Sequence, residues 1–273
     1  MKNTGRSLAL HAAVAAVAVL TLIPLLWMFS ASFMPPGAAN TMPPPLIPRT
    51  PTLEHYVALF TRLNVLRNFL NSLLISTVTT IISLFINALA GYAFAKLRFA
   101  GRDRIFHLLV VGLVVPAQVG MLPLFLMVRG LGLVNTPWGV MIAALASIFG
   151  IFMIRQYALG IPDELLDAAR VDGASEFLIF RRIVLPLLRP ILVTLAAFSF
   201  LGTWNDFLWP LIVLSDESKF TLPVALASLV GEHVLDTELM MAGAVVTVVP
   251  VLILFLFLQR SYIRGVLMGS VKG

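Results

Sequence analysis

Six apolar runs, each long enough to cross a bilayer, dominate this sequence. They extend over Leu8 to Phe29, Phe69 to Ala95, Ile105 to Val128, Thr136 to Met153, Ile191 to Leu214 and Met241 to Leu258. A helix of about 20 apolar residues spans the roughly 30 Å hydrocarbon core of a membrane. Because 59% of the 273 residues are hydrophobic and only 12% are charged, we expect lipid to cover most of the surface.

These runs predict helices and not the strands of a membrane barrel. Hydrocarbon offers the backbone no hydrogen-bond partners, so a spanning segment must satisfy its own N–H and C=O groups. The alternating pattern of a lipid-facing barrel strand is absent. We therefore expect an all-α integral membrane protein with about six transmembrane helices and one transmembrane domain over residues 1–273. Its internal prolines should act as kinks, namely Pro24, Pro116, Pro123, Pro210 and Pro250.

The connecting segments predict the orientation of the chain. Fourteen of the 19 Lys and Arg residues lie before the first run, after the second and fourth runs, or after the last one. Because Lys and Arg are enriched in cytoplasmic loops, both termini are predicted to be cytoplasmic. A cleaved signal peptide is a second interpretation of the first run, but that run is longer than the apolar part of a signal peptide, which favours an uncleaved helix.

Two longer segments lie on the opposite side. The first, from Pro35 to Arg67, is rich in proline, so it should begin as extended chain, with a short helix from Leu53. The second, from Ser215 to Glu238, is polar and acidic and predicts a loop with at most a short helix. Neither is expected to form a separate domain.

Several kinds of site are excluded or unsupported by the sequence. The chain has no cysteine, which excludes disulfides and thiolate chemistry, and its four histidines show no metal-ligand spacing, so no metal site is predicted. Its basic residues form small clusters and no continuous track, which argues against nucleic-acid binding. No G-x-x-x-x-G-K-[ST] phosphate loop is present, so the chain is not expected to bind ATP or act as an enzyme.

One polar stretch, IPDELLDAARVDGASEFLIFRRIVLP from Ile161 to Pro186, stands out between the fourth and fifth runs. Pro162 suits the first position of a helix that ends near Arg170, and Gly173 breaks the chain. Ser175 can cap a second short helix, which Pro186 should stop. An element that docks on another protein and an amphipathic helix on lipid headgroups are equally good interpretations of these residues alone.

The stretch DAARVDGASEFLIFRRIVLP resembles the E-A-A-x-x-D-G-A signature of ABC importer permeases, with Asp167 where that family usually has Glu. PLLWMFSASF, NSLLISTVTT, GYAFAKLRFAGRD, TWNDFLWPLIVL and FLQRSYIRGVLMGSVKG resemble the carbohydrate-uptake, maltose-type branch of that family, so the resemblance covers nearly the whole chain. It implies the type I importer permease fold, in prokaryotes a component of the cytoplasmic (inner) membrane.

The resemblance also implies a role for residues 161–186 and a set of partners. The stretch would be the coupling helix that docks on a separate ATPase, with Asp167, Ala168, Ala169, Asp172, Gly173, Ala174, Phe177, Phe180 and Pro186 carried over as coupling residues. The chain would form half of a sugar or oligosaccharide pathway with a second permease subunit. Two ATPase subunits would use ATP and Mg²⁺, and an external solute-binding protein would deliver the solute.

Polar residues inside the apolar runs are candidates for that pathway. Asp206 is the only acidic residue in a predicted span, and ionisable groups in membranes usually face protein or water. Its neighbours Trp204 and Asn205 suit sugars, which need both stacking and hydrogen bonds. Asn87, Tyr92 and Gln118 are further candidates, although helix-to-helix hydrogen bonding explains each of them as well.

Two other functions fit the composition. A glycerol-phosphate or polyol importer of the same class would share these sequence features. An ion-coupled secondary transporter would normally place ionisable residues near the middle of the membrane and contain an internal repeat. Only Asp206 approaches the first condition, and no repeat is seen.

Overall fold

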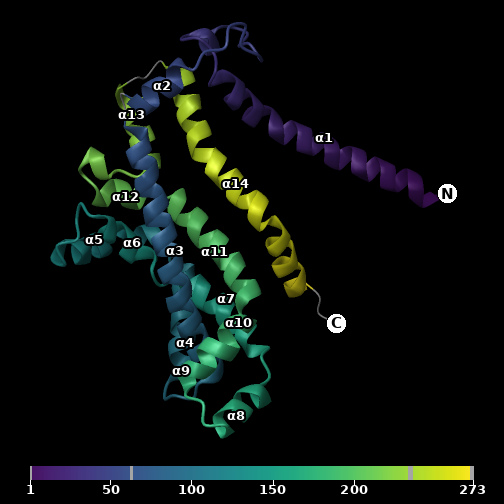
Figure 1. Cartoon of the computed structure of the whole chain (residues 1–273), viewed down its shortest axis with the longest axis vertical. Helices are drawn as coiled ribbons and strands as arrows, with labels where there is room; N and C mark the ends of the chain where they lie inside the picture. Colours follow the sequence, from purple (N-terminus) through teal and green to yellow (C-terminus); the bar gives the residue numbers. More distant parts are fainter. Residues whose placement is uncertain (1, 62–63, 233–235, 271–273) are drawn as a thin grey trace. The chain divides into compact units, whose positions relative to one another are not determined.

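The described part of the chain folds into helices joined by turns and loops (Figure 1). A computed structural model describes residues 2–61, 64–232 and 236–270, and no residue in these ranges lies in a β-strand. The all-α prediction is therefore confirmed.

Within the described ranges, three helices are long and apolar enough to cross a membrane without a break. They are α1 (Lys2–Ala31), α3 (Val65–Lys96) and α14 (Thr237–Ser270). Pro24 and Pro250 lie inside α1 and α14 without ending them, so the prediction of kinks is compatible with both.

Two further apolar runs are broken helices. In the first, α4 (Arg102–Val111) and η2 (Gly112–Val114) meet η3 (Ala117–Gly120) and α5 (Met121–Gly130) at 103°. In the second, α6 (Pro137–Met141) and η4 (Ile142–Ala144) meet α7 (Ile148–Leu159) at 43°. Pro116 causes more than the predicted kink, because Val115 before it is extended, as the residue preceding a proline prefers, and the helix ends there.

The fifth run is also interrupted. Helix α11 (Arg189–Trp204) ends before Asn205, and α12 (Leu208–Val213) begins three residues later. Asp206 lies in the gap, and its Oδ1 accepts a hydrogen bond from Trp209 N at 3.4 Å, which favours a new helix start at that point. A continuous helix over Ile191 to Leu214 is therefore a wrong prediction.

The described chain reaches six spans only if each of three bent helix pairs counts as one. The third pair joins Glu176–Leu187 to Arg189–Trp204 at 78°. The predicted span count is thus compatible with the structure, although half of the spans are not simple helices.

The two polar segments differ in how well they were predicted. Helix α2 (Glu54–Thr61) confirms the short helix expected after Leu53. The segment after Ser215 contains η6 (Glu217–Lys219) and the 11-residue helix α13 (Leu222–Glu232), which is more than the short helix predicted. Leu222 at the start of α13 is buried, and its N donates to Ser72 Oγ at 2.7 Å. The local sequence does not reveal this tertiary contact.

The chain divides into two compact units. The first comprises Met1–Arg67 and Ala225–Pro250. In it the short helix η1 (Ala38–Asn40) is attached to the start of α14, where buried Glu238 accepts a 2.7 Å hydrogen bond at Oε1 from Ala39 N.

The second unit comprises Asn68–Val224 and Val251–Gly273. Its main core lies around the C-terminal half of α3, where Ala88 and Tyr92 pack in one cluster with Ile154, Leu166 and Phe180. Helices α3 and α7 approach closely at Gly91, since a Cβ there would lie 2.6 Å from Ile154 Cγ2. This core supports the candidate site.

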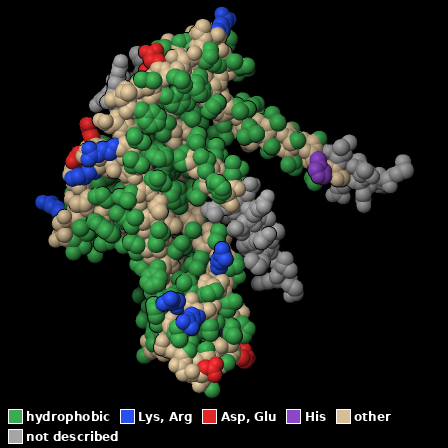
Figure 2. Space-filling view, in the orientation of Figure 1, with side chains coloured by type: hydrophobic (Ala, Val, Ile, Leu, Met, Phe, Trp, Pro, Cys, Tyr) green, Lys and Arg blue, Asp and Glu red, His purple; other side chains and the backbone are tan. Residues whose placement is uncertain are grey.

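The surface is largely apolar, as a membrane protein requires. Figure 2 shows hydrophobic side chains over most of the visible face, with Lys, Arg, Asp and Glu in a few separate places. Leu108, Val114 and Phe257 are all more than 70% exposed. Such side chains are stable in lipid and would aggregate in water.

Candidate functional site

The polar stretch from Ile161 to Pro186 forms a helical hairpin. It contains α8 (Asp163–Val171), α9 (Glu176–Ile179), the π-helical turn η5 (Phe180–Val184) and α10 (Leu185–Leu187). Gly173 has φ +82°, a left-handed conformation that glycine adopts without strain, and it reverses the chain after α8. The side chain of Ser175 accepts from Leu178 N, so the predicted turn and cap are both confirmed.

The charges of α8 follow the helix dipole. Asp163 and Glu164 lie in its first turn, near the positive end, and Arg170 lies in its last turn. Pro162 precedes the helix as its N-cap and does not occupy the predicted first helical position. Pro186 does not stop the second helix as predicted, because it lies in the first turn of α10, where a missing backbone N–H is tolerated, and the helical segment continues to Leu187. The rest of residues 161–186 has local reasons to fold as the sequence predicts.

The nine predicted coupling residues divide into an outward and an inward set. The outward set is exposed and comprises Asp167, Ala168, Asp172, Gly173, Phe177 and Pro186. Ala169 and Ala174 are partly buried against the core of the second unit. Phe180 is only 2% exposed and packs on Tyr92, with 5.7 Å between ring centroids, whereas Phe177 is 58% exposed. Phe180 therefore anchors the hairpin, and Phe177 is the phenylalanine that a partner can reach.

A chain of polar contacts ties the hairpin to α3. Tyr92 donates its hydroxyl to Glu176 Oε2 at 2.7 Å, and Arg170 Nε donates to Glu176 Oε1 at 2.7 Å. Arg170 Nη1 also donates to Asp167 Oδ1 at 2.6 Å. These contacts join α8 and α9 to the membrane helix through charge-assisted hydrogen bonds.

A second set of hydrogen bonds joins the hairpin to the end of α3. Lys96 Nζ donates to Ile161 O and to Asp163 Oδ1, both at 2.6 Å. This hydrogen bond from Lys96 lowers the pKa of the Asp163 carboxyl, which favours its charged form. The last two turns of α3 therefore hold both the beginning and the second helix of the hairpin.

A cavity of about 520 Å³, here called the Asp206 cavity, lies at the break between α11 and α12. Its lining includes Gln118 from η3 and Asn205, Asp206 and Trp209 from the break and α12. Trp209 is fixed there, because its Nε1 donates to Gly139 O at 3.2 Å. The fold thus brings two side-chain amides, a carboxyl group and an aromatic ring together around one cavity, although some of these residues are far apart in the sequence.

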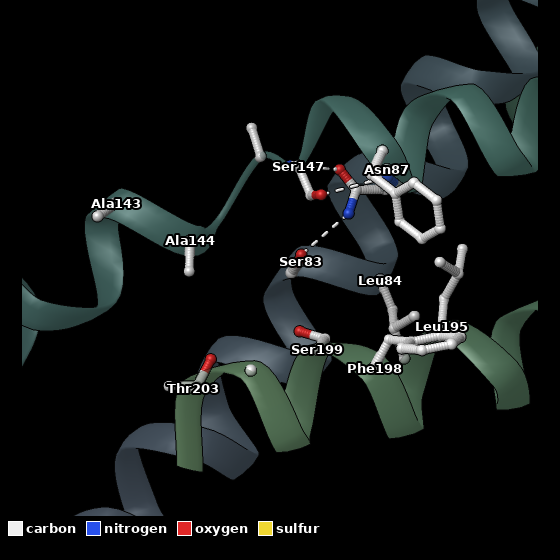
Figure 3. Close-up of a pocket in the computed structure, with 14 residues that line it drawn as sticks. Ser83, Leu84, Asn87, Ala143, Ala144, Ser147, Leu195, Phe198, Ser199 and Thr203 are labelled. Atoms are coloured by element: carbon white, nitrogen blue, oxygen red, sulfur yellow. Dashed lines mark hydrogen bonds between the residues drawn. The ribbon is translucent and has the colours of Figure 1, made fainter. Parts of the chain in front are cut away.

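A second cavity of about 310 Å³, here called the Ser199 cavity, lies between α3, α7 and α11 (Figure 3). Its lining includes Ser83, Asn87, Ser147, Phe149, Phe198 and Ser199. The two cavities adjoin, because Ala143, Ala144, Gly202 and Thr203 line both.

The six predicted path residues have different positions. Gln118, Asn205 and Asp206 line the Asp206 cavity, and Asn87 lines the Ser199 cavity. Trp204 lines neither: it is fully buried between Phe69 and Phe200, with ring centroids 5.6 and 5.7 Å away. Tyr92 belongs to the hairpin contacts described above.

Several residues that line the cavities could not be recognised from the sequence. Ser147, Ser199 and Thr203 look like ordinary small residues of apolar helices. One signal was present in α3, where Ser72, Ser76, Ser83 and Asn87 recur at spacings of one or two helical turns and are all buried. Such spacing marks a polar face turned toward protein.

Comparison with known proteins gives a consistent result. The family model for "Binding-protein-dependent transport system inner membrane component" matches residues 87–267, which include the hairpin, the whole Asp206 cavity and most of the Ser199 cavity. The arabinooligosaccharides transport system permease protein AraQ of Halalkalibacterium halodurans is 42% identical over 260 residues, covering 94% of this chain and 93% of that protein. The lactose transport system permease protein LacG of Rhizobium radiobacter is 33% identical, covering 93% and 92%.

A solved structure resembles this fold along its length. A chain from a bacterial ABC transporter involved in import of the acidic polysaccharide alginate superposes with a TM-score of 0.83. The match covers 95% of this chain and 97% of that one at 24% identity. At this identity the similarity establishes the fold alone.

Proposed function

Because this chain belongs to the family of binding-protein-dependent transport system inner membrane components, and is thus a multi-pass permease subunit of an ABC importer, we propose that it carries a sugar or oligosaccharide. The observation that carries the proposal is the Asp206 cavity, where Gln118, Asn205 and Asp206 face one hollow together with Trp209. Polar groups beside an aromatic ring suit a sugar, whose C–H face stacks while its hydroxyls form hydrogen bonds. The printed names of the relatives, which refer to arabinooligosaccharides and lactose, support the same class of solute.

The exposed side of the hairpin is the proposed docking surface for a separate ATPase. Asp167, Ala168, Asp172, Gly173 and Phe177 would contact the partner, while Phe180 and Glu176 attach the hairpin to the subunit. Two such ATPase subunits would bind ATP and Mg²⁺. Their closure would move the hairpin and, through Tyr92 and Lys96, the end of α3.

The proposed function also implies the remaining partners and the orientation of the chain. The whole chain would act as one permease domain, paired with a second permease subunit, and an external solute-binding protein would deliver the sugar. Both termini and the hairpin would lie on the cytoplasmic side, where basic residues such as Lys96 and Arg155 concentrate. Alternating access would then expose the cavities to each side in turn.

Affinity purification tests this function. The tagged chain would be purified from mild detergent, copurifying proteins identified, and vanadate-sensitive ATP hydrolysis measured. A second permease and an ATPase in the eluate are expected. A chain that is purified intact, alone and without ATPase activity would contradict the proposal.

A further inference from the structure

We propose that the Ser199 cavity is a second sugar subsite, which receives one neutral sugar ring at a time from the Asp206 cavity. The inference rests on the proposed sugar pathway and adds to it a position, a set of ligating groups and a preference for uncharged sugar. The two cavities are neighbours in one unit, with Gly202 and Thr203 lining both.

Two hydroxyl groups at this cavity have no hydrogen-bond partner among the residues that the structure describes. Ser199 and Thr203 lie one helical turn apart on α11, so both face the same side, and both line the cavity (Figure 3). Neither side chain hydrogen-bonds within the described part of the chain. Thr194 on the same helix behaves differently, since its hydroxyl donates to Pro190 O at 3.3 Å. Ser199 and Thr203 are thus the hydroxyls that remain free for a ligand.

Their expected depth in the membrane, counted from Arg189 as the cytoplasmic end of the span, makes this unusual. Ser199 is ten residues beyond Arg189, the first residue of α11, which corresponds to about 15 Å along a helix. That is about half of the roughly 30 Å hydrocarbon thickness. Free hydroxyls at such depth are costly unless water or solute contacts them.

Two phenylalanine rings form an apolar wall of the same cavity. Phe149 and Phe198 are 43% and 46% exposed, and their rings meet edge to face with centroids 6.2 Å apart. Phe198 and Ser199 are adjacent on α11, so hydroxyl groups and ring surface are available to one ligand. This combination matches the apolar C–H face and polar edge of a sugar ring.

Asn87 positions the cavity wall and is not itself a free ligand. Its Nδ2 donates to Ser83 Oγ at 2.9 Å, and its Oδ1 accepts from Ser147 N at 3.0 Å (Figure 3). A Cβ on Gly150 would lie 2.6 Å from Asn87 Nδ2, so glycine is required there for α7 to approach. Asn87 therefore stabilises the break between η4 and α7, where Ser147 lines the cavity.

Size and charge define the ligand. A volume of about 310 Å³ is at the lower end of the roughly 300–1,000 Å³ of small-molecule sites, so the cavity holds a ring and not an oligosaccharide. Among the described residues, none that lines the Ser199 cavity is charged. A phosphate or uronate group would lack a counter-charge in this cavity, so a neutral sugar is favoured.

Cysteine accessibility tests the subsite directly. The chain has no cysteine, so Ser199→Cys and Thr203→Cys each introduce its only thiol. Ala197→Cys is the matched control, because Ala197 is a small residue of α11 that lines neither cavity. Labelling by a charged methanethiosulfonate reagent would be followed on this chain within the assembled transporter in membrane vesicles, with ATP and the binding protein present. Arabinotriose, lactose and glycerol 3-phosphate serve as probes.

The expected result is labelling at positions 199 and 203 that a transported neutral sugar slows and glycerol 3-phosphate does not. Ala197→Cys should label slowly under all conditions. Labelling at 199 that no sugar changes, or an unreactive thiol there, would overturn the subsite.

Should the thiols impair assembly, Ser199→Ala with Thr203→Val gives an independent readout. We expect the KM for sugar uptake to rise about fivefold for each hydrogen bond lost, while the amount of assembled complex stays constant. An unchanged KM would overturn the subsite but leave the sugar importer intact. A wild-type transporter that moves no sugar would overturn both.

Discussion

Tyr92 of α3 donates a 2.7 Å hydrogen bond to Glu176, the first residue of α9. The two residues are 84 positions apart, and the contact joins a membrane helix to the hairpin proposed to dock on the ATPase. Arg170 reinforces it by donating to the other oxygen of the same carboxylate. Coupling between ATP hydrolysis and transport should therefore depend on this contact.

Removing the Tyr92 hydroxyl should loosen coupling without preventing assembly. Tyr92→Phe keeps the ring that packs on Phe180 and deletes a hydrogen bond to a charged group, which is typically worth about 1.5–3 kcal/mol. We expect the number of sugars transported per ATP hydrolysed to fall severalfold. Tyr157→Phe is the control, because the Tyr157 hydroxyl has no hydrogen bond among the described residues. Equal coupling ratios in the two variants would contradict the proposed transmission.

A side chain at Gly173 should disturb docking and leave the subunit itself intact. Gly173 has φ +82°, and a Cβ there would meet nothing within 4 Å. Asparagine tolerates this conformation, so Gly173→Asn should insert normally but lose at least about tenfold of the copurifying ATPase, because even about 1.4 kcal/mol of lost contact has that effect.

Gly37→Asn provides a matched comparison for that variant. Gly37 also has φ +82° with open space around its Cβ, but it lies outside the hairpin. It should retain the ATPase at the wild-type level. Equal retention by both variants would remove Gly173 from the docking surface.

Close packing between α3 and α7 should be sensitive to one methyl group. At Gly91 a Cβ would lie 2.6 Å from Ile154 Cγ2 and 3.0 Å from Arg155 N, so Gly91→Ala forces the two helices apart. Overpacking of this kind costs about 1–3 kcal/mol, and a lower melting temperature in detergent is expected. Gly120→Ala, where a Cβ meets nothing within 4 Å, should melt like the wild type. A wild-type melting temperature for Gly91→Ala would show that the helices are not packed this tightly.

The ion pair between Lys96 and Asp163 gives a defined pH dependence. Because Lys96 lowers the pKa of Asp163 in the folded chain, the stabilisation is fully present above the unfolded pKa of about 3.9. It is lost as the pH falls through the lower folded pKa. The difference in melting temperature between the wild type and Asp163→Asn should therefore be constant from about pH 8 to 5 and shrink below about pH 4.

Glu164→Gln controls for the loss of an acidic residue in the same turn, since Glu164 is exposed and has no ion pair among the described residues. Its melting temperature should stay close to that of the wild type at every pH. If the melting temperature of the wild type exceeded that of Asp163→Asn by a larger margin in acid than at neutral pH, the predicted direction of the pH dependence would be wrong.

The sequence predicted the hairpin well because its signals are local. Gly173, Ser175 and the charges of α8 each act within a few residues, so their effect can be inferred without tertiary information. The six apolar runs were equally clear. They did not reveal that three of the spans bend. They also did not reveal the separate break at Asn205 and Asp206, because that break depends on hydrogen bonding at the start of α12.

The cavities were predicted only in part for a related reason. Asp206 and Gln118 are conspicuous in apolar surroundings, whereas Ser199 and Thr203 acquire meaning only from the cavity beside α11. Trp204 and Tyr92 were both candidates for the sugar path, but packing buries the first and a long-range hydrogen bond holds the second at the hairpin. Side-chain type indicated candidates, and tertiary contacts selected among them.

Sugar uptake by proteoliposomes is the most direct test of the proposed function. The transporter would be reconstituted with its second permease and ATPase subunits, and radiolabelled arabinotriose or lactose would be supplied with the binding protein outside and ATP inside. We predict uptake that requires both ATP and the binding protein and persists when ion gradients are collapsed. Uptake that continues without ATP and stops when the ion gradients are collapsed would contradict an ATP-driven importer and identify an ion-coupled transporter.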